Sequence, residues 1–432
     1  MRLLNAPARP SATRPLGGDL AFYCVCLAFA LPTALFNEFY GYRVWGNFAT
    51  VAYAFGALHS GWLLWSARAG KRPIGLLGSR WCGIAVVALL AMILPLGILV
   101  IRRLTGVDWL ITPFSWAAQP EVWVIERSAD LLLQHGTPYV DVTALGRAPV
   151  VNDYTPYGPV MAIFGLPRAI FGGSPPADAL TDARWMFALA ASGCVLGALK
   201  LLRWPQVPVR AAQLALACPL TALTWAVAGP DLAIVGLLVL SCALAATGRA
   251  GLSGLVLALV VSAKLIVAPA AAVLAVFVLL RHGKDWPALG RFAAALGLTT
   301  VVLHLPVYLA DPKAFTEHVI RFPLGMGVVR SPAASPLPGH LLAEIAGPWL
   351  AFVLVGAAAV AVVIWLARRP PVTGSDALLR IAVGLGALIL LTPATRFGYL
   401  VYPLVLLGAH LVFRAAEDGT APPAQQSAVT SS

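Results

Sequence analysis

The sequence predicts an all-α integral membrane protein, and three observations lead to this prediction. Of the 432 residues, 59% are hydrophobic and only 11% are charged, whereas water-soluble domains carry roughly a quarter charged residues. The apolar residues form runs of about 20 residues, the length that a helix needs to cross a bilayer. Arginines and lysines stand between these runs, as expected of loop charges that orient a membrane protein. The predicted class is a polytopic helical bundle.

Ten apolar runs are each long enough for one spanning helix. They are 20–36, 47–66, 81–101, 184–202, 211–228, 231–247, 291–309, 346–367, 377–393 and 399–414. The run 251–280 is long enough for two short helices that meet near Lys264. We therefore expect about 12 transmembrane helices, with 155–171 as a re-entrant segment that enters and leaves on the outer side. The alternative is that 155–171 crosses completely and a weaker run does not.

Loop charges predict the orientation of the chain. Four basic groups mark cytoplasmic loops: Arg68, Lys71, Arg72 and Arg80; Lys200, Arg203 and Arg210; Arg281, Lys284 and Arg291; and Arg368, Arg369 and Arg380. Both termini then lie in the cytoplasm, with 1–19 as an N-terminal segment and 20–415 as the transmembrane domain. The tail 416–432 is rich in Ala, Pro, Gln and Ser, which predicts disorder. The basic N-terminus suits a signal peptide, but a retained first helix is preferred because further spans follow immediately.

Two long polar segments, 102–154 and 310–345, fall on the same outer face in this topology. A shared site between them is geometrically reasonable. Neither is long enough for an independent soluble domain, so any chemistry would take place at the membrane surface. Scarce lysine beside abundant arginine and alanine is typical of a high-GC bacterial proteome, which predicts a bacterial cytoplasmic membrane as the location.

Composition and motif content exclude several other functions. The net charge of +12 could suggest nucleic acid, but no basic patch with interleaved aromatic residues is present, so no nucleic-acid partner is expected. The six cysteines lie inside apolar runs without zinc or disulfide spacing, and we interpret them as small core residues. The outer segments hold no Asp-x-Asp pair and the chain holds no Walker motif. We therefore predict no metal, no ATP and no cofactor.

The stretch 120–135 predicts one short helix. Pro120 suits the first helical position and Gly136 the position just past the end. Apolar side chains gather on one face and polar ones on the other, as in a helix that lies in the membrane interface. Glu121 lies in its first turn, where the helix N-terminus favours the ionised carboxylate. Such a carboxylate can accept a proton from an attacking hydroxyl; the alternative is that Glu121 is only a favourable first-turn charge.

Several segments then resemble one family of membrane enzymes. The stretch 119–141 combines an acid, an aromatic and aliphatic turn, Ala-x-Leu-Leu, a glycine and Pro-Tyr. It is followed by Tyr154-Thr-Pro-Tyr-Gly-Pro159, Gly229-Pro-Asp231, Ala250-Gly-Leu-Ser-Gly-Leu255 and Val261-Ser-Ala-Lys-Leu-Ile-Val-Ala-Pro269. In this order the segments are similar to the polyprenol-phosphate-mannose-dependent α-1,2-mannosyltransferases of glycosyltransferase family 87, in the GT-C superfamily. The resemblance covers about 119–280 and, more loosely, the rest of the chain.

The resemblance implies a GT-C helical bundle and a catalytic base in the first outer loop. The family carries an aspartate there, and the matching position in this sequence holds Glu121, which is longer by one methylene. Other carboxylates in the same region are alternative bases, although each could also be an interface charge paired with a nearby arginine. These alternatives are Glu126, Asp130 and Asp153.

Four cations are predicted to bind the phosphate of a lipid-linked donor: Lys264, Arg321, Arg330 and Arg396. An intramembrane lysine is costly unless it is paired, and a lipid phosphate would satisfy Lys264. The planar guanidinium of arginine suits phosphate oxygens. The alternatives are a snorkelling lysine and structural ion pairs.

Further side chains are predicted to contact substrate because they lie in the outer segments or at helix starts on the same side. They are Arg127, Asp153, Tyr154, Tyr157, Asp231, His318 and Tyr399. Helix capping is an equally good interpretation for Asp231. An interfacial aromatic belt would account equally for Tyr399 and Tyr402.

Together these observations predict a membrane glycosyltransferase of the cell envelope. It would transfer a sugar, mannose in the first instance, from a polyprenyl-phosphate donor to a glycolipid or glycan acceptor on the outer face, with inversion. Membrane lipids are its surroundings and the two substrates its partners. The rival hypotheses are a transporter or lipid flippase without chemistry, which would place charges along a path near the midplane, and a noncatalytic relative that acts as a partner subunit.

Overall fold

The computed structural model describes residues 10–71, 73–105 and 116–420. Within these ranges the chain is built of helices, with two isolated β-bridges. The predicted all-α membrane fold is confirmed. The chain divides into two compact units: unit 1 comprises 1–119 and 212–228, and unit 2 comprises 120–211 and 229–432.

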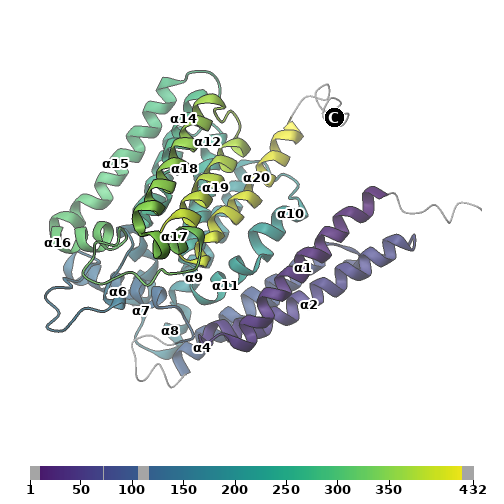
Figure 1. Ribbon diagram of the computed structural model, residues 1–432, viewed down its shortest axis with the longest axis horizontal. Coiled ribbons are helices and arrows are strands. Elements are labelled where there is room, and N and C mark those ends of the chain that lie inside the picture. Colours follow the sequence, from purple (N-terminus) through teal and green to yellow (C-terminus); the bar gives the residue numbers. More distant parts are fainter. Residues whose placement is uncertain (1–9, 72, 106–115, 421–432) are drawn as a thin grey trace, which may run out of the picture. The chain divides into compact units, whose positions relative to one another are not determined.

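Unit 1 is built around the neighbouring helices α1 and α2, which Figure 1 shows side by side. Its helices are α1 (Pro10–Phe36), α2 (Tyr40–Arg68), η1 (Leu76–Gly78), α3 (Trp81–Val87), η2 (Ala88–Ile93), α4 (Leu94–Thr105), η5 (Gln213–Ala217) and α11 (Pro219–Val227), with α10 (Val209–Ala212) at the boundary. Gly46 of α2 allows the close approach, because a Cβ atom there would lie 2.6 Å from the backbone nitrogen of Ala34. Small residues at such contacts are typical of membrane helices.

Two π-helical turns offer backbone carbonyls to buried aromatic side chains in unit 1. The indole Nε1 of Trp45 donates to the carbonyl of Ala91 in η2 at 2.9 Å, and the hydroxyl of Tyr53 donates to the carbonyl of Ala217 in η5 at 3.0 Å. Widened turns of this kind leave carbonyls without a helical partner. The two hydrogen bonds therefore satisfy polar groups inside an apolar core.

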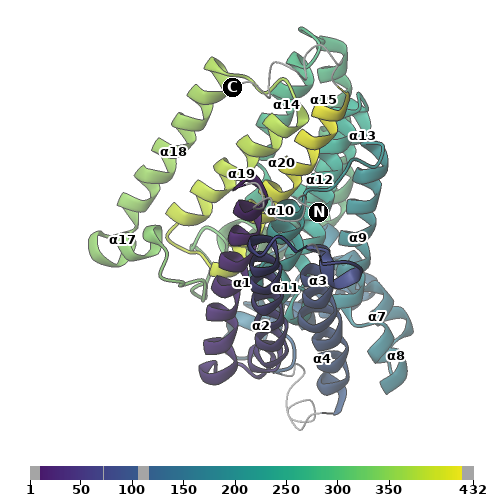
Figure 2. The same ribbon diagram turned by 90° about the vertical axis from the view of Figure 1, so that its right-hand side faces the viewer.

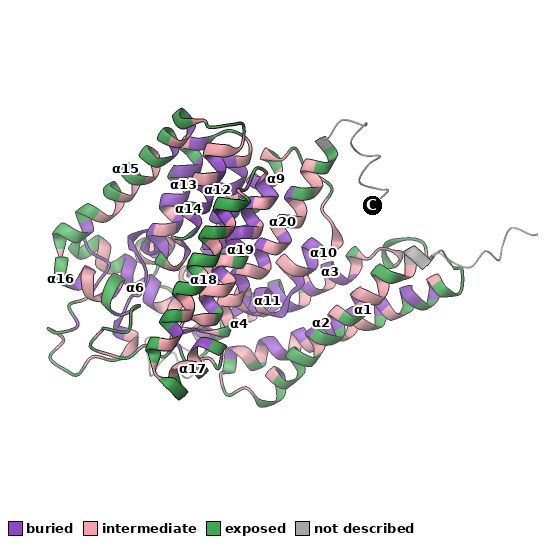
Figure 3. Ribbon diagram, turned by 45° about the horizontal axis from the view of Figure 1, so that its top comes forward, coloured by how far each residue is buried: buried purple, intermediate pink, exposed green. Residues whose placement is uncertain are grey.

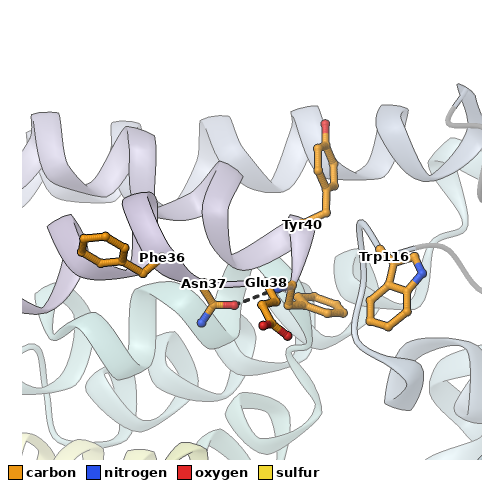
Figure 4. Close-up of a pocket in the computed structure, with 6 residues that line it drawn as sticks. Phe36, Asn37, Glu38, Tyr40 and Trp116 are labelled. Atoms are coloured by element: carbon orange, nitrogen blue, oxygen red, sulfur yellow. Dashed lines mark hydrogen bonds between the residues drawn. The ribbon is translucent and has the colours of Figure 1, made fainter.

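A hollow of about 790 Å³ lies at the turn between α1 and α2 (Figure 4). It is lined by Phe36, Asn37, Glu38, Phe39, Tyr40 and Trp116. The side-chain oxygen of Asn37 accepts a hydrogen bond from the backbone N–H of Phe39 at 2.9 Å, which shapes this turn. The lining contains none of the predicted site residues.

Unit 2 is built around α12, which packs against α9, α13, α14, α19 and α20. Its helices are α6 (Pro120–His135), η3 (Val151–Asp153), η4 (Pro159–Gly165), α7 (Leu166–Phe171), α8 (Pro175–Leu180), α9 (Ala183–Leu201), α12 (Pro230–Ala246), α13 (Ala250–Ala263), η6 (Leu265–Val267), α14 (Ala270–Leu280), α15 (Trp286–Ala310), α16 (Pro312–Phe315), η7 (Thr316–Arg321), α17 (Pro338–Ala346), α18 (Pro348–Arg368), α19 (Gly374–Leu391), η8 (Phe397–Leu400) and α20 (Val401–Thr420). Figure 2 shows α17 and α18 at one edge of this group. Apolar residues along α15 and α18 are exposed (Figure 3), as expected of helices that face lipid.

The described chain contains fewer long apolar helices than the 12 predicted crossings. Seven helices are long and apolar enough to span a bilayer, or eight if the pair of α11 and α12 counts as one span. Helix length accounts for most of the difference, because a spanning helix needs about 20 residues. Helices α11, α12, α13 and α14, which form four of the predicted crossings, have only 9, 17, 14 and 11 residues. The predicted break near Lys264 is confirmed. The helical part of 155–171, Pro159–Phe171, is also too short to cross.

Several predicted boundaries shift in the structure. Helix α1 begins at Pro10, inside the predicted N-terminal segment 1–19, and α20 continues to Thr420, inside the predicted disordered tail. Glu417 favours this continuation, because its carboxylate accepts hydrogen bonds from the backbone N–H and the hydroxyl of Ser375. Arg72, residues 1–9 and 106–115, and the tail from 421 lie outside the described residues.

Residues 120–154 of the first predicted outer segment meet the second segment at one end of unit 2. Helix α6 belongs to the first segment, and α16 and α17 belong to the second. Figure 1 shows all three at the same end of the unit 2 helices. Residues 120–154 of the first segment and the second segment thus lie at one end of unit 2, and the predicted outer location of this end stays a prediction.

Candidate active site

Unit 2 contains a cluster of charged and aromatic side chains, here called the polar cluster. Its members are Glu121, Tyr157, Asp231, Lys264, Arg396, Tyr399 and Tyr402. Two ion pairs form its centre, and three tyrosine rings surround one of the cations. All members except Tyr402 were predicted from the sequence as site residues.

Asp231 reaches the cluster through the start of α12. Gly229 precedes this helix with φ of 92°, a left-handed conformation that favours glycine, and a Cβ there would lie 2.8 Å from the ring of Phe187. Pro230 occupies the first helical position, so Asp231 lies in the first turn. The positive end of the helix dipole stabilises a carboxylate at this position.

Lys264 reaches the cluster through a helix break. Helix α13 ends at Ala263, and Lys264 has an extended backbone with φ of −152° and ψ of 119°. Pro269 lacks an N–H and could not bond the carbonyl of Leu265 in a continuous helix; that carbonyl instead accepts from the backbone N–H of Ala268 at 2.9 Å. The break turns Lys264 out of the apolar helix and toward Asp231.

Tyr157 is positioned by the turn 155–159 against this break. The backbone N–H of Gly158 donates to the carbonyl of Ala263 at 3.0 Å. A Cβ at position 158 would lie 2.0 Å from the carbonyl oxygen of Ser262, so only glycine fits. The hydroxyl of Tyr139 donates to the carbonyl of Tyr157 at 2.8 Å and supports the same turn.

The ammonium group of Lys264 is surrounded by one carboxylate and three aromatic rings. Its Nζ lies 2.5 Å from Oδ1 of Asp231. The same Nζ lies 4.2 Å from the ring centre of Tyr399, 5.7 Å from that of Tyr157 and 5.8 Å from that of Tyr402. Cation–π contacts of this kind stabilise a desolvated cation. The side chains of Lys264 and Asp231 are 10% and 13% exposed, so the ion pair is largely removed from water.

The second ion pair joins Glu121 to Arg396. The Nη1 of Arg396 donates to Oε1 of Glu121, whereas Oε2 of Glu121 is buried without a hydrogen-bond partner among the described residues. Arg396 is held in place by its neighbour Thr395, whose backbone forms an isolated β-bridge with Ala334. The Arg396 side chain is 35% exposed. The cluster is therefore open on the side of this pair and leaves one carboxylate oxygen unused.

Electrostatic interactions connect the two ion pairs. Tyr157 interacts with the carboxylates of Glu121 and Asp231 and with the guanidinium of Arg396. Lys264 interacts with Glu121 as well as with Asp231. The two pairs thus form one site with two cations and two carboxylates.

A family model described as glycosyltransferase family 87 matches residues 154–395, more than half of the sequence. The chain belongs to glycosyltransferase family 87. This is the family that the sequence motifs resembled. The matched range contains Tyr157, Asp231 and Lys264, whereas Glu121 and Arg396 lie outside it.

One solved structure is similar to this family 87 chain over a large part of its length. It is the crystal structure of ArnT from Cupriavidus metallidurans in the apo state, with a TM-score of 0.46 and 18% sequence identity. The similarity covers 80% of this chain and 60% of the ArnT chain. Comparison with curated proteins gave no match.

His318 lies outside the polar cluster and joins the two predicted outer segments. Its Nδ1 accepts a hydrogen bond from the backbone N–H of Thr155 at 2.8 Å, so its Nε2 carries the proton and donates to the carbonyl of Val140 at 2.8 Å. Burial lowers the pKa of His318 to about 4, which keeps the ring neutral near pH 7. Tyr154 makes a second connection, because its hydroxyl donates to Glu317 at 2.8 Å.

Arg127 and Asp153 brace the loop that follows α6. The guanidinium of Arg127 donates to the carbonyls of Asn152 and Asp153 at 2.8 and 2.9 Å, and burial lowers the pKa of Arg127 to about 10. The carboxylate of Asp153 accepts two hydrogen bonds from Arg147 at 2.6 and 2.7 Å. This pairing with Arg147 lowers the pKa of Asp153. Both residues therefore shape the loop that carries Tyr157.

Arg321 and Arg330 are placed apart from the polar cluster. Both side chains are exposed on the segment 312–330. Arg321 lies 3.3 Å from the carboxylate of Glu317 and donates to the carbonyl of Met326. The structure thus brings two of the four predicted phosphate-binding cations, Lys264 and Arg396, into one site and leaves the other two at the surface.

The two alternative bases on α6, Glu126 and Asp130, lie outside the polar cluster. Glu126 is buried, and its Oε1 accepts a hydrogen bond from the backbone N–H of Ala183 at 3.1 Å, which fixes α6 against the start of α9. Asp130 is exposed on α6, and burial by its neighbours still raises the pKa of its carboxyl group. Neither residue lies in the polar cluster.

Tyr402 belongs to the polar cluster but was not predicted from the sequence as a site residue. Its hydroxyl donates to Oδ1 of Asp231 at 2.6 Å. A signal was present, because Tyr399 and Tyr402 are three residues apart and residues at this spacing share a helix face. The alternative interpretation of both tyrosines as an interfacial aromatic belt kept Tyr402 out of the predicted site.

Proposed function

We propose that this family 87 glycosyltransferase transfers mannose from a polyprenyl-phosphate donor to a glycolipid or glycan acceptor. The acceptor would lie on the outer face of a bacterial cytoplasmic membrane. The observation that carries the proposal is the polar cluster, which combines two cations, an ion-paired carboxylate with one unused oxygen, and a partly open position. These groups match the needs of a displacement at a sugar-phosphate bond.

Glu121 is the proposed general base. Arg396 holds its Oε1, and the buried Oε2 has no hydrogen-bond partner among the described residues, so Oε2 keeps its capacity to accept a proton. In a single displacement the hydroxyl oxygen forms a bond to the anomeric carbon and its proton passes to Oε2 of Glu121. The bond from the anomeric carbon to the phosphate oxygen breaks, and the polyprenyl phosphate leaves with the electron pair. Such a step inverts the anomeric configuration.

Lys264 and Arg396 are the proposed phosphate-binding cations. Negative charge develops on the leaving phosphate in the transition state, and fixed cations in a site shielded from water stabilise it strongly. Aromatic rings around Lys264 offer surfaces for a sugar ring or an isoprene unit. Asp231 and the tyrosines complete the predicted substrate contacts.

The test is a transfer assay with protein in lipid nanodiscs, radiolabelled polyprenyl-phosphate mannose and a membrane glycolipid extract. We expect transfer by the wild type and a loss of about 10²–10⁴-fold in Glu121→Gln, the usual contribution of a general base. Glu126→Gln is the matched control, because it changes a carboxylate on the same helix outside the cluster. A chelator should leave transfer unchanged if no metal takes part.

Each other outcome has a definite meaning. Undiminished transfer in Glu121→Gln would remove Glu121 as the base and direct attention to Asp231 and Asp153. Absence of transfer from every polyprenyl-phosphate sugar, together with uptake of a solute into vesicles, would favour a transporter and contradict the proposal.

A further inference from the structure

Two hydrogen-bond donors in the polar cluster converge on one oxygen atom. Lys264 Nζ lies 2.5 Å from Oδ1 of Asp231, and the hydroxyl of Tyr402 donates to the same Oδ1 at 2.6 Å. The donors come from the break after α13 and the first turn of α20, so neither depends on α12 for its position. An ammonium and a hydroxyl arranged in this way form a binding position for one anionic oxygen.

In this structure the position is filled by the protein's own carboxylate. Each cation of the cluster has a carboxylate partner: Lys264 pairs with Asp231, and Arg396 pairs with Glu121. An incoming phosphate would therefore meet a cluster without spare positive charge. Binding of an anion requires that one carboxylate give up its cation, because a carboxylate and a phosphate that share one desolvated ammonium repel each other.

Asp231 is the carboxylate better suited to leave. Asp231 and Glu121 both lie in the first turn of a helix, α12 and α6 respectively, so the helix N-terminus stabilises either charge when its cation is withdrawn. The two differ in their roles, because the proposed function needs Glu121 in place as the base and gives Asp231 no proton to accept. We infer that the Asp231 carboxylate occupies the position of the donor phosphate in the empty site. When the donor binds, its phosphate replaces Asp231 as the partner of Lys264 and Tyr402. Asp231 re-forms these contacts when the product leaves.

This inference rests on the proposed function only for the identity of the anion, a phosphate group. Asp231 is then a positioning residue that acts through Lys264. It would keep the buried ammonium ionised between turnovers and help to displace the product phosphate. Removal of its charge should strengthen anion binding and slow product release.

The experiment compares wild type with Asp231→Asn, which keeps the shape and the hydrogen bond from Tyr402. Thermal unfolding in nanodiscs is followed with increasing polyprenyl phosphate in the lipid, and in separate samples with inorganic phosphate. We expect the variant to be less stable without ligand, since Lys264 loses its counter-ion, and to gain more from phosphate than the wild type. A stronger response to polyprenyl phosphate than to inorganic phosphate would identify the lipid as the source.

Steady-state transfer adds a second measurement. Asp231→Asn should lower KM for the donor and lower kcat with it, each by about tenfold, which corresponds to ~1.4 kcal/mol. Inhibition by polyprenyl phosphate should become tighter by a similar factor. A purely structural ion pair would lower stability without lowering KM, and a general base at Asp231 would lower kcat alone; either result would overturn the inference.

Two further variants make the test specific. Asp182→Asn breaks a different buried ion pair of unit 2, in which Asp182 Oδ1 lies 2.8 Å from Nε of Arg184. It should lower stability without a gain in the response to phosphate. Tyr402→Phe in the Asp231→Asn background removes the second donor and should weaken the phosphate response; an unchanged response would contradict the convergent site.

Failure of the proposed function is distinguishable from failure of the inference. If no sugar is transferred but Asp231→Asn still responds to phosphate, the anion position stands and the reaction must be reconsidered. If transfer is observed but the variant shows no added response, the inference is wrong and the proposed function is retained.

Discussion

The polar cluster and the segment 312–330 both carry cations that the sequence assigned to phosphate binding, yet they differ in surroundings. In the cluster, the side chain of Lys264 is 10% exposed and pairs with Asp231. On the segment, the side chain of Arg321 is 54% exposed and pairs with a neighbour four residues away, Glu317. Lys264 is therefore surrounded by groups distant in sequence, whereas Arg321 contacts a carboxylate of its own helical turn.

The energetic contribution of a charged side chain thus depends on its exposure to water and not only on the sign of its charge. Two charges about 4 Å apart interact with roughly 1 kcal/mol in water and several times more at a partly desolvated site. Exposed pairs contribute about 0–1 kcal/mol, whereas removal of one partner of a buried pair costs about 3–5 kcal/mol. The same residue types should therefore have very different effects when they are replaced.

The largest expected effect is in the buried pair. Lys264→Met leaves Asp231 without its cation, and we expect a loss of about 3–5 kcal/mol in the free energy of unfolding together with loss of transfer. The double variant Lys264→Met/Asp231→Leu should regain most of the stability but no activity, because two apolar side chains then fill the site. Denaturant unfolding in mixed micelles measures the stability of the single and the double variant, and the transfer assay measures their activity. A loss below ~1 kcal/mol in the single variant would show that the pair is effectively solvated.

A matched pair of arginine variants gives the next effect. Arg396→Met should lower kcat by about 10²–10³-fold, since it removes a proposed transition-state contact and frees the carboxylate of Glu121. Arg321→Met deletes the same kind of charge from the exposed segment. Equal losses in both variants would mean that the segment moves onto the cluster during turnover.

His318 provides a structural prediction for the segment itself. His318→Phe keeps a ring but removes two buried hydrogen bonds, to the backbone of Thr155 and of Val140. Buried groups left without partners cost about 1–3 kcal/mol each. Hydrogen exchange should therefore speed up in 139–155 and 312–330 but not in α12. Unchanged hydrogen exchange in these loops would show that the hydrogen bonds of His318 do not hold the two segments together.

The same residue predicts a pH dependence. The pKa of His318 is about 4 in the folded protein against 6.5 without burial. Between these values the unfolded chain binds the proton and the folded chain does not, so stability falls as pH falls from about 6.5 to about 4, by at most ~3 kcal/mol. Above pH 6.5 this contribution is fully present. Unfolding from pH 7.5 to 4.5 should show the slope in wild type, and a smaller slope in His318→Phe.

The smallest expected effect belongs to the exposed arginines. Arg330→Gln and Arg321→Gln should change KM for the donor by about twofold or less, the scale of ~0.5 kcal/mol for surface substitutions. A rise of about tenfold in KM, or ~1.4 kcal/mol, would support the sequence-based prediction that these arginines bind the donor phosphate.

Local features of the fold could be predicted because short-range rules decide them. Pro120 and Gly136 bound α6 as expected, with Gly136 at φ of 71°, because capping depends on a few adjacent residues. The run 251–280 breaks at Lys264 as predicted, into helices of 14 and 11 residues. The number of long apolar helices could not be predicted from run lengths, since the runs 211–228 and 231–247 yield helices α11 and α12 of only 9 and 17 residues.

The sequence by itself determined that this is an all-α membrane protein of glycosyltransferase family 87, and it selected Glu121, Asp231, Lys264 and Arg396 as candidates. Only the tertiary structure decided that Glu121 pairs with Arg396, 275 residues away, and that Lys264 pairs with Asp231, which also accepts a hydrogen bond from Tyr402. The physical reason is that a desolvated charge must find a partner, and the partner is chosen by the packing of helices. Sequence spacing alone contains no information about which distant carboxylate each cation meets.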